Sequence, residues 1–144
     1  RPSGRRLRGR GIAMPIEYQR DDQRRLIRIT MTDPFSFDDL LSQTDRQWAE
    51  RTWDYAVLYD SRASQHIPPP GELQRLVEHT QMIGGGRSRG PVGVAIPRKS
   101  EAVRRGLDLA ERSGPLRDIE ILLNETQIAS WLVRHAARRG PSAQ

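Results

Sequence analysis

Cysteine is absent from the 144 residues, so the chain forms no disulfide and has no thiolate nucleophile or cysteine metal ligand. The three histidines, His66, His79 and His135, have no ligand spacing such as His-x-x-x-His, and we expect no metal site and no other cofactor. Apolar runs reach about five residues, whereas a membrane helix needs roughly 20. We therefore expect a cytoplasmic protein without membrane contact.

Lysine is almost absent, because all but Lys99 of the 24 basic residues are arginine. The net charge is +6, yet residues 1–13 alone contribute five arginines and no acid, and residues 138–144 contribute two more. Residues 14–137 hold 17 basic and 18 acidic residues and are electrically balanced. A nucleic-acid-binding protein usually carries a basic face on its folded part, so this distribution disfavours a nucleic-acid partner.

The composition also predicts the domain boundaries. Residues 1–13 are rich in glycine and arginine and have no helix or strand pattern, so we expect a disordered basic N-terminal extension ahead of Met14. One α/β domain is expected over residues 14–137, because this length supports a single core. Residues 138–144 are expected to form a disordered tail.

The hydrophobic pattern predicts five strands and four helices in the order β-β-α-β-α-β-α-β-α. The expected strands are 16–19, 26–32, 55–59, 92–96 and 119–123. The expected helices are 36–52, a segment between the prolines at 68–70 and the glycines at 84–86, 100–112, and a last one after Asn124, with Gln127 placed for a capping box. Alternation of strands and helices predicts a single open, mostly parallel five-stranded sheet, with the first strand antiparallel because a hairpin joins it to the second.

Gly84–Gly90 (GGGRSRG) resembles a phosphate-binding loop only superficially. It follows a helix and opens a strand, which is the reverse of the order that a phosphate-binding loop requires, and it lacks the Gly-Lys-Ser/Thr ending. We interpret it as a helix end followed by a mobile basic loop. Trp53, at the junction into the middle strand, is a candidate for a half-exposed contact with a partner.

Four stretches carry a resemblance to a known family. They are Met-Pro-Ile-Glu-Tyr at 14–18, Tyr-Ala-Val-Leu-Tyr-Asp-Ser-Arg at 55–62, Gly-Pro-Val-Gly-Val-Ala-Ile-Pro at 90–97 and Asn-Glu-Thr-Gln-Ile-Ala-Ser-Trp-Leu at 124–132. In this order the chain resembles the STAS-like proteins, the sulfate transporter and anti-sigma-factor antagonist superfamily. The resemblance implies a STAS-like fold and a non-enzymatic binding or regulatory module.

The same resemblance draws attention to the serines after the middle strand. Antagonists of this superfamily bind a kinase partner and are released when a serine at this place is phosphorylated. The matching stretch here is Asp60–His66, which contains Ser61 and Ser64 but lacks the family's Ser-Ser-Gly element. The departure puts a phosphorylation switch in doubt.

Ligands of open α/β sheets collect beyond the carboxyl ends of the strands. We therefore expect a protein partner or small ligand to bind a rim formed by Asp60, Ser61, Arg62, Ser64, Arg98 and Ser100. Helix N-termini and cationic side chains there are suited to an acidic group. The alternative is that Asp60, Ser100 and Asn124 only cap loops and helices.

Two other functions fit the sequence less well. The first is an enzyme whose site forms around Asp60, Arg62 and His66, which requires the three side chains to converge in a closed pocket. The second is a nucleic-acid-associated protein that acts through its arginine-rich tails, in which case binding should depend steeply on salt.

Overall fold

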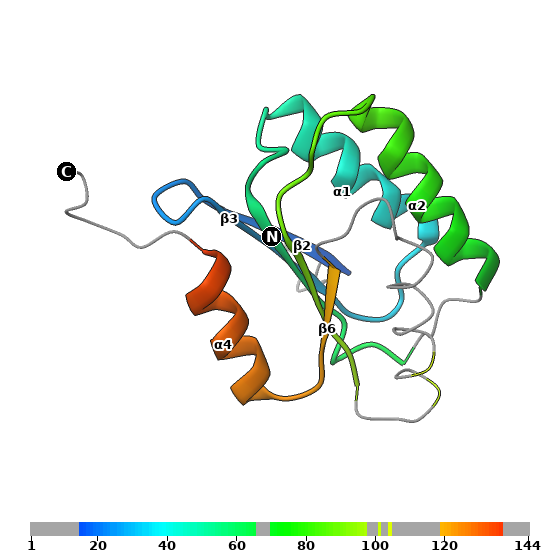
Figure 1. Ribbon diagram of the computed structural model, residues 1–144. Helices are drawn as coiled ribbons and strands as arrows, with labels where there is room; N and C mark the ends of the chain where they lie inside the picture. The colour runs from blue at the N-terminus through cyan, green and yellow to red at the C-terminus, as the bar shows by residue number, and fades with distance from the viewer. Residues whose placement is uncertain (1–14, 66–69, 98–100, 102–103, 105–118, 137–144) are drawn as a thin grey trace, which may run out of the picture.

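The computed structural model describes residues 15–65, 70–97, 101, 104 and 119–136 (Figure 1). The elements are strand β2 (Ile16–Asp21), strand β3 (Leu26–Met31), helix α1 (Phe37–Ala49), strand β4 (Ala56–Asp60), helix α2 (Pro70–Gly84), strand β5 (Val92–Ala95), strand β6 (Ile119–Leu122) and helix α4 (Glu125–His135). The predicted α/β class with one mixed five-stranded sheet is confirmed. The predicted helix 100–112 falls largely outside the described residues, as do both predicted tails.

The strands lie in the sheet in their sequence order, β2-β3-β4-β5-β6. The first pair is an antiparallel hairpin in which Ile16 faces Met31 and Asp21 faces Leu26. Strands β3, β4, β5 and β6 pair in parallel. The carboxyl ends of these four strands therefore lie along one edge of the sheet, which we call the carboxyl edge, and their starts lie along the opposite amino edge.

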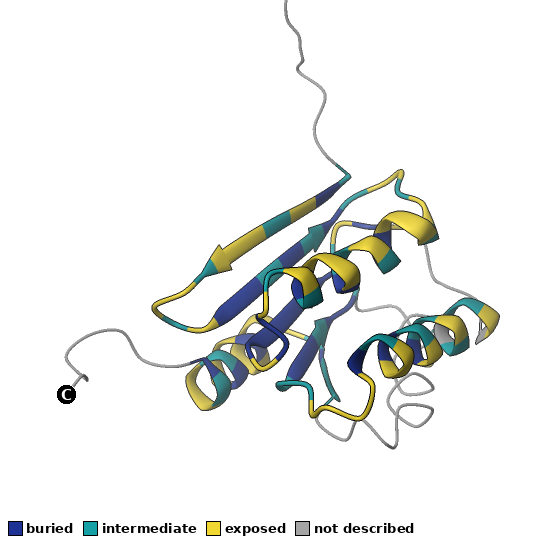
Figure 2. Ribbon diagram, turned by 90° about the horizontal axis from the view of Figure 1, so that it is seen from above, coloured by how far each residue is buried: buried dark blue, intermediate teal, exposed yellow. Residues whose placement is uncertain are grey.

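The two faces of the sheet are covered by different helices (Figures 1 and 2). Helices α1 and α2 cover the face that receives Ile27, Ile29 and Val57, which are fully buried together with Leu40 of α1. Alternate residues of a strand point to opposite faces. The intervening residues, such as Leu58, accordingly pack with Ile128 and Trp131 of α4 on the other face.

Trp131 fixes α4 against the sheet through close contact with a glycine. Its ring is fully buried, and a Cβ at Gly93 of β5 would lie 2.8 Å from it. Only a residue without a side chain leaves that space. The helix begins at the predicted cap, where the Gln127 N–H donates to Asn124 Oδ1 at 2.9 Å, but the Gln127 side chain accepts from the N–H of Leu123 at 2.7 Å instead of Asn124.

Helix α1 is shorter than predicted at its carboxyl end. It begins after a reciprocal capping box between Ser36 and Asp39, but it ends at Ala49 instead of residue 52. Arg51 adopts φ 63°, and the side chain of Gln47 donates to the Thr52 carbonyl at 2.8 Å while the Thr52 hydroxyl donates to the Gln47 carbonyl at 3.1 Å. These buried hydrogen bonds fold the chain back toward β4, a tertiary effect that periodicity does not show.

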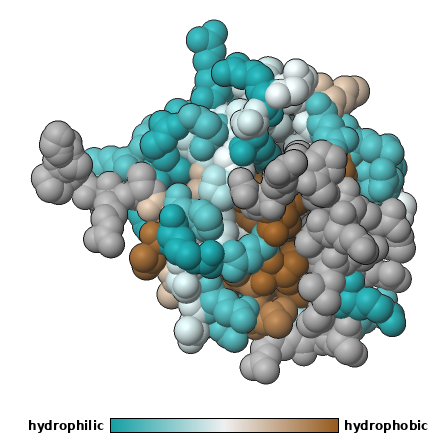
Figure 3. Space-filling view, in the orientation of Figure 1, coloured by the Kyte–Doolittle hydropathy of each residue, from teal (hydrophilic) through white to brown (hydrophobic). Residues whose placement is uncertain are grey.

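Strand β6 lies at one side of the sheet and is less buried than the central strands. Ile119 and Ile121 are half-buried, whereas every residue of β4 is buried. Figure 3 shows hydrophobic surface near the centre of the view, where Figure 1 places β6. Most of the remaining described surface in this view is hydrophilic.

Candidate functional site

Four of the six predicted binding residues lie at the carboxyl edge of the sheet. Asp60 is the last residue of β4, and Ser61, Arg62 and Ser64 follow it directly. Asp60 pairs in register with Thr30 of β3 and Ala95 of β5, so it occupies the centre of the edge. Two further predicted residues, Arg98 and Ser100, are outside the described residues, and the structure does not place them.

Arg62 joins two carboxylates from different parts of the chain. Its Nε and Nη2 donate to the two oxygens of Asp60 at 2.9 and 2.8 Å, and its own N–H donates to Asp60 Oδ1 at 3.1 Å. Nη1 donates to Glu125, in the first turn of α4. Sequence analysis did not predict the role of Glu125, because the pairing spans 63 positions and depends on the sheet order.

The charges of this group are stabilised together. Burial alone would raise the pKa of Asp60, which is 8% exposed, but the hydrogen bonds and charge of Arg62 hold that pKa below its ordinary value. The same carboxylate and Glu125 raise the pKa of Arg62. Asp60 is therefore an ionised carboxylate whose partner is already in place, and the loop after β4 is fixed to the start of α4.

The two predicted serines are also engaged. The Ser61 hydroxyl donates to the Ala95 carbonyl at 2.9 Å, and the same carbonyl accepts the Ser61 N–H at 2.9 Å. Ser64 is 2% exposed, and its hydroxyl donates to Asp33 Oδ1 at 2.7 Å. Asp33 lies in the loop after β3 and also accepts the N–H of Gln65. The rim thus connects the loops after β3 and β4 with the end of β5 and the start of α4.

This arrangement positions polar groups rather than activating a nucleophile. Both serine hydroxyls use their proton on an oxygen acceptor, and the carboxylates are paired with Arg62, Ser64 or backbone N–H groups. His66, on which the enzyme alternative depends, lies outside the described residues, so that alternative is untested. The rim presents fixed donors and acceptors over the width of the parallel strands.

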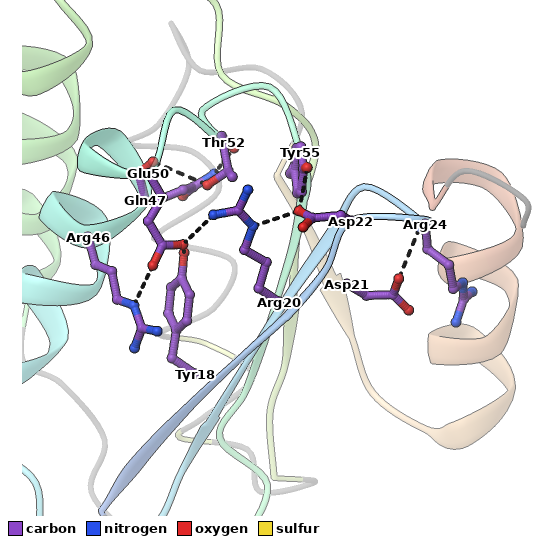
Figure 4. Close-up of polar contacts among 10 residues, drawn as sticks. All are labelled: Tyr18, Arg20, Asp21, Asp22, Arg24, Arg46, Gln47, Glu50, Thr52 and Tyr55. Atoms are coloured by element: carbon purple, nitrogen blue, oxygen red, sulfur yellow. Dashed lines mark hydrogen bonds and ion pairs between the residues drawn. The ribbon is translucent and has the colours of Figure 1, made fainter.

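A second polar cluster, which sequence analysis missed, lies toward the amino edge (Figure 4). Glu50, just after α1, accepts hydrogen bonds from Tyr18 at 3.1 Å, Arg20 at 3.2 Å and Arg46 at 2.9 Å. Asp22 accepts from Arg20 and from Tyr55 at 2.6 and 2.7 Å. The cluster ties α1 to the hairpin and to the start of β4, and its residues come from segments too far apart for a local pattern to reveal.

The same cluster changes the acidity of its members. Burial raises the pKa of Tyr18 to about 12, and the neighbouring Glu50 carboxylate acts in the same direction. Burial would raise the pKa of Glu50, but hydrogen bonds from Arg46 and Tyr18 lower it overall. Tyr18 is thus held as a neutral phenol and Glu50 as a carboxylate.

Arg89, from the loop after α2, reaches into the space beside α1 and β4. Its Nη2 donates to Gln47 Oε1 at 2.8 Å and to the Tyr59 hydroxyl at 3.1 Å, and its Nε is buried without a hydrogen-bond partner. Its guanidinium lies 4.9 Å from the centre of the Trp53 ring. Trp53 is 7% exposed, so the expectation of a half-exposed tryptophan was wrong, because Arg89 and Gly84 cover its ring.

In the described part of the chain, no helix is long and apolar enough to cross a membrane. The same residues contain no group of three or more histidine, aspartate or glutamate side chains that could hold a metal ion. Comparison of this chain with protein-family models, with curated proteins and with solved structures found no match.

Proposed function

We propose that this chain is a STAS-like, non-enzymatic binding and regulatory module that recognises a protein partner at its carboxyl edge. The observation that carries the proposal is Arg62, which holds Asp60 and Glu125 in one fixed group at the place where α/β sheets bind their ligands. Groups that are paired before binding cost little entropy to order when a partner arrives.

The extent of the rim favours a protein over a small molecule. It runs from Asp33, after β3, to Glu125, after β6. Three spacings between neighbouring strands amount to roughly 14 Å. A surface of that width, with its donors and acceptors distributed over several loops, suits a partner that contacts many points at once.

Ser61 gives the rim a means of regulation at the place where the STAS-like antagonists have theirs, although the chain lacks the family's Ser-Ser-Gly element. Ser61 is half-buried, and its hydroxyl donates to the Ala95 carbonyl beside Asp60. A phosphate on this oxygen would remove the hydroxyl proton that Ser61 donates to Ala95 and would add oxygens that can only accept. It would also place negative charge beside the Ala95 carbonyl and the Asp60 carboxylate. Phosphorylation of Ser61 would therefore open the rim and release a partner. Ser64 is buried and is not accessible to a kinase without local opening.

Site-specific photo-crosslinking tests the proposal. A photoreactive amino acid at Ala63, which is exposed between Arg62 and Ser64, should form a discrete protein adduct in the cells that naturally express the chain. Arg62→Gln should abolish the adduct, and Glu125→Gln should weaken it. Arg134→Gln is the matched control, because Arg134 also pairs bidentately with a carboxylate, Glu120, but lies away from the rim.

The outcomes separate the alternatives. Loss of the adduct in the rim variants supports the proposal, provided that each variant is still folded at the temperature of the experiment and that the Arg134→Gln adduct is retained. An adduct that is equally strong in Arg62→Gln and Glu125→Gln rejects the rim as the binding surface. A metabolite that raises the melting temperature without any protein adduct at Ala63 would replace the protein partner by a small ligand.

A further inference from the structure

Three arginines at the amino edge lack the carboxylate partners that Arg62 has at the carboxyl edge. Arg51 follows α1, and Arg87 and Arg89 follow α2; the first two are exposed and the third is half-buried. Within the described ranges none of the three makes an ion pair, although Arg20, Arg25 and Arg46 nearby all do. Their positive charge is therefore not neutralised by a side chain.

The segment that carries Arg87 and Arg89 is fixed in place by the backbone. The Gly90 N–H donates to the Trp53 carbonyl at 2.9 Å, and a Cβ at Gly90 would lie 2.3 Å from the Tyr55 carbonyl oxygen. The loop after α2 is therefore packed directly against the loop after α1. The prediction of a mobile basic loop does not describe this part of it.

Aromatic rings hold the guanidinium groups in position. The Arg87 guanidinium lies 5.7 Å from the centre of the Trp48 ring, and Arg89 lies 4.9 Å from that of Trp53. The two tryptophans pack edge to face at 5.3 Å. Stacking on a ring positions a guanidinium but does not cancel its charge, because the ring offers only a quadrupole.

Among the described residues, Arg89 is the clearest case of a positive charge without a carboxylate partner. Its two hydrogen-bond partners are neutral, and its Nε is buried without an acceptor. A half-buried cation is costly unless an anion compensates for it. The C-terminal ends of α1 and α2 lie at this edge and supply partial negative charge, but their effect falls off within the last turn.

We propose that Arg51, Arg87 and Arg89 form a second interaction surface that binds an acidic segment of a protein. The exposed guanidinium groups of Arg51 and Arg87 can each take a carboxylate in a forked pair, the geometry for which arginine is best suited. Arg89, whose Nη2 is bonded to Gln47 and Tyr59, contributes its positive charge from beside them. This surface is distinct from the carboxyl-edge rim and lies at the other end of the strands, so the domain could contact two partners, or two parts of one partner, at once.

A nucleic acid fits the surface less well, for two reasons. The amino edge also carries the carboxylates of Glu50 and Asp54, which pair with Arg20, Arg46 and Arg25, and these carboxylates would repel a phosphate backbone that ran along the edge. The Trp53 ring is buried beneath Arg89 and is not available to stack on a base, as single-strand binding requires. A peptide with separated carboxylates avoids both difficulties.

Nuclear magnetic resonance titration of the full chain with a ten-residue peptide of alternating glutamate and glycine tests the proposal. The amide signals of residues 84–90 and the indole signals of Trp48 and Trp53 should shift. The double variant Arg51→Gln/Arg87→Gln should weaken binding roughly threefold to tenfold, because exposed charge pairs are individually modest. Both side chains are exposed, so the fold should survive the change.

Arg75→Gln is the matched control. Arg75 is likewise exposed, lacks an ion pair among the described residues and lies over an aromatic ring, at 4.8 Å from the centre of Phe37, but Phe37 begins α1 at the carboxyl edge. It should bind the peptide as the unchanged chain does. All variants keep the arginine-rich tails, so the tails contribute equally.

Three results would overturn the proposal. The first is peptide-induced shifts confined to the tails. The second is equal affinity of the double variant, Arg75→Gln and the unchanged chain. The third is an oligothymidine of ten nucleotides that moves the same loop and indole signals at a lower concentration than the peptide, which would assign the surface to nucleic acid.

Discussion

The carboxyl and amino edges of this sheet differ in how they treat charge. At the carboxyl edge Arg62 is shared by Asp60 and Glu125, whereas the partners of Arg89 at the amino edge, among the described residues, are the neutral Gln47 and Tyr59. Helix direction accounts for much of the contrast. Helices α1, α2 and α4 begin at the carboxyl edge and have acidic residues in their first turns, where negative charge is favoured.

The amino edge receives the C-terminal ends of α1 and α2, where positive charge is favoured. Backbone dipoles thus favour the acids in the first turns of α1, α2 and α4 at the carboxyl edge, and they favour Arg46 in the last turn of α1 at the amino edge. The difference teaches that a domain of balanced composition can distribute its ion pairs unevenly between two edges. At the carboxyl edge Arg62 is paired with two carboxylates, whereas Arg51, Arg87 and Arg89 at the amino edge make no ion pair with any residue that the structure describes.

The largest expected effect concerns the backbone contact that builds the amino edge. Gly90→Ala would place a Cβ 2.3 Å from the Tyr55 carbonyl oxygen and 2.6 Å from that of Asp54. Backbone atoms cannot yield as a flexible side chain does, so we expect a loss of roughly 3 kcal/mol in the free energy of unfolding. Urea denaturation followed by tryptophan fluorescence measures it.

Gly71→Ala is the control for this prediction. Gly71 lies at the start of α2, and a Cβ there meets no atom within 4 Å. Alanine is a better helix former than glycine, so the free energy of unfolding should stay the same or rise slightly. Equal stability of the two alanine variants would show that the loops do not depend on the Gly90 contact.

The next effect concerns the central carboxylate of the rim. Asp60→Ala removes three hydrogen bonds and leaves a half-buried guanidinium with only the exposed Glu125. We expect a loss of about 2 kcal/mol in the free energy of unfolding. Thermal and urea denaturation measure it, and Glu125→Gln should cause no measurable loss. If Glu125→Gln costs as much as Asp60→Ala, the bridge to α4 rather than the buried pair stabilises the rim.

A smaller loss is expected at the Glu50 cluster. Glu50→Gln keeps the size of the side chain, and its amide oxygen can still accept from Tyr18 or Arg20, but the charge opposite Arg46 is lost. Because the side chain is 25% exposed, water screens the pair, and we expect a loss of about 1 kcal/mol. Raising the salt concentration should reduce the difference in the free energy of unfolding between the unchanged chain and Glu50→Gln, as measured by urea denaturation. If salt leaves this difference unchanged, the stabilisation is not ionic.

Sequence patterns predicted what depends on neighbours along the chain. The hairpin, the parallel strands and the cap at Asn124 follow from residue periodicity and local hydrogen bonding, and Asp60 was placed at the edge because it ends a buried apolar run. The helix α1 boundary was missed because Gln47, a residue type usually exposed, is fully buried and bonded to Thr52.

The unpredicted parts of both edges depend on pairing across the fold. Arg62 and Glu125 are joined only because β4 and β6 end at the same edge. Arg89 and Trp53 come together because Gly90 allows two loops to touch, and the motif GGGRSRG indicated only a helix end and a basic loop. Patterns in a single sequence predict neither contact, because each contact depends on which loops lie side by side in the folded chain.

The smallest expected effects on stability come from changes of pH. Low pH affects the carboxyl edge through Asp60, and high pH affects the amino edge through Tyr18. The folded-state pKa of Asp60 is lowered, so its contribution to stability is complete above the ordinary aspartate pKa of about 3.9 and is lost as the pH falls through the lowered value. The pKa of Tyr18 is raised to about 12, so its contribution is complete below the ordinary tyrosine pKa of about 10 and is lost as the pH rises toward 12.

Two isosteric variants separate these effects in urea denaturation across pH. The stability difference between the unchanged chain and Asp60→Asn should shrink only below about pH 4, and that for Tyr18→Phe only above about pH 10. Each variant is the control for the other, because each removes one titration and leaves the opposite edge intact. A difference that does not change with pH for either variant would mean that the corresponding edge is held by its hydrogen-bond geometry alone, with no contribution from charge.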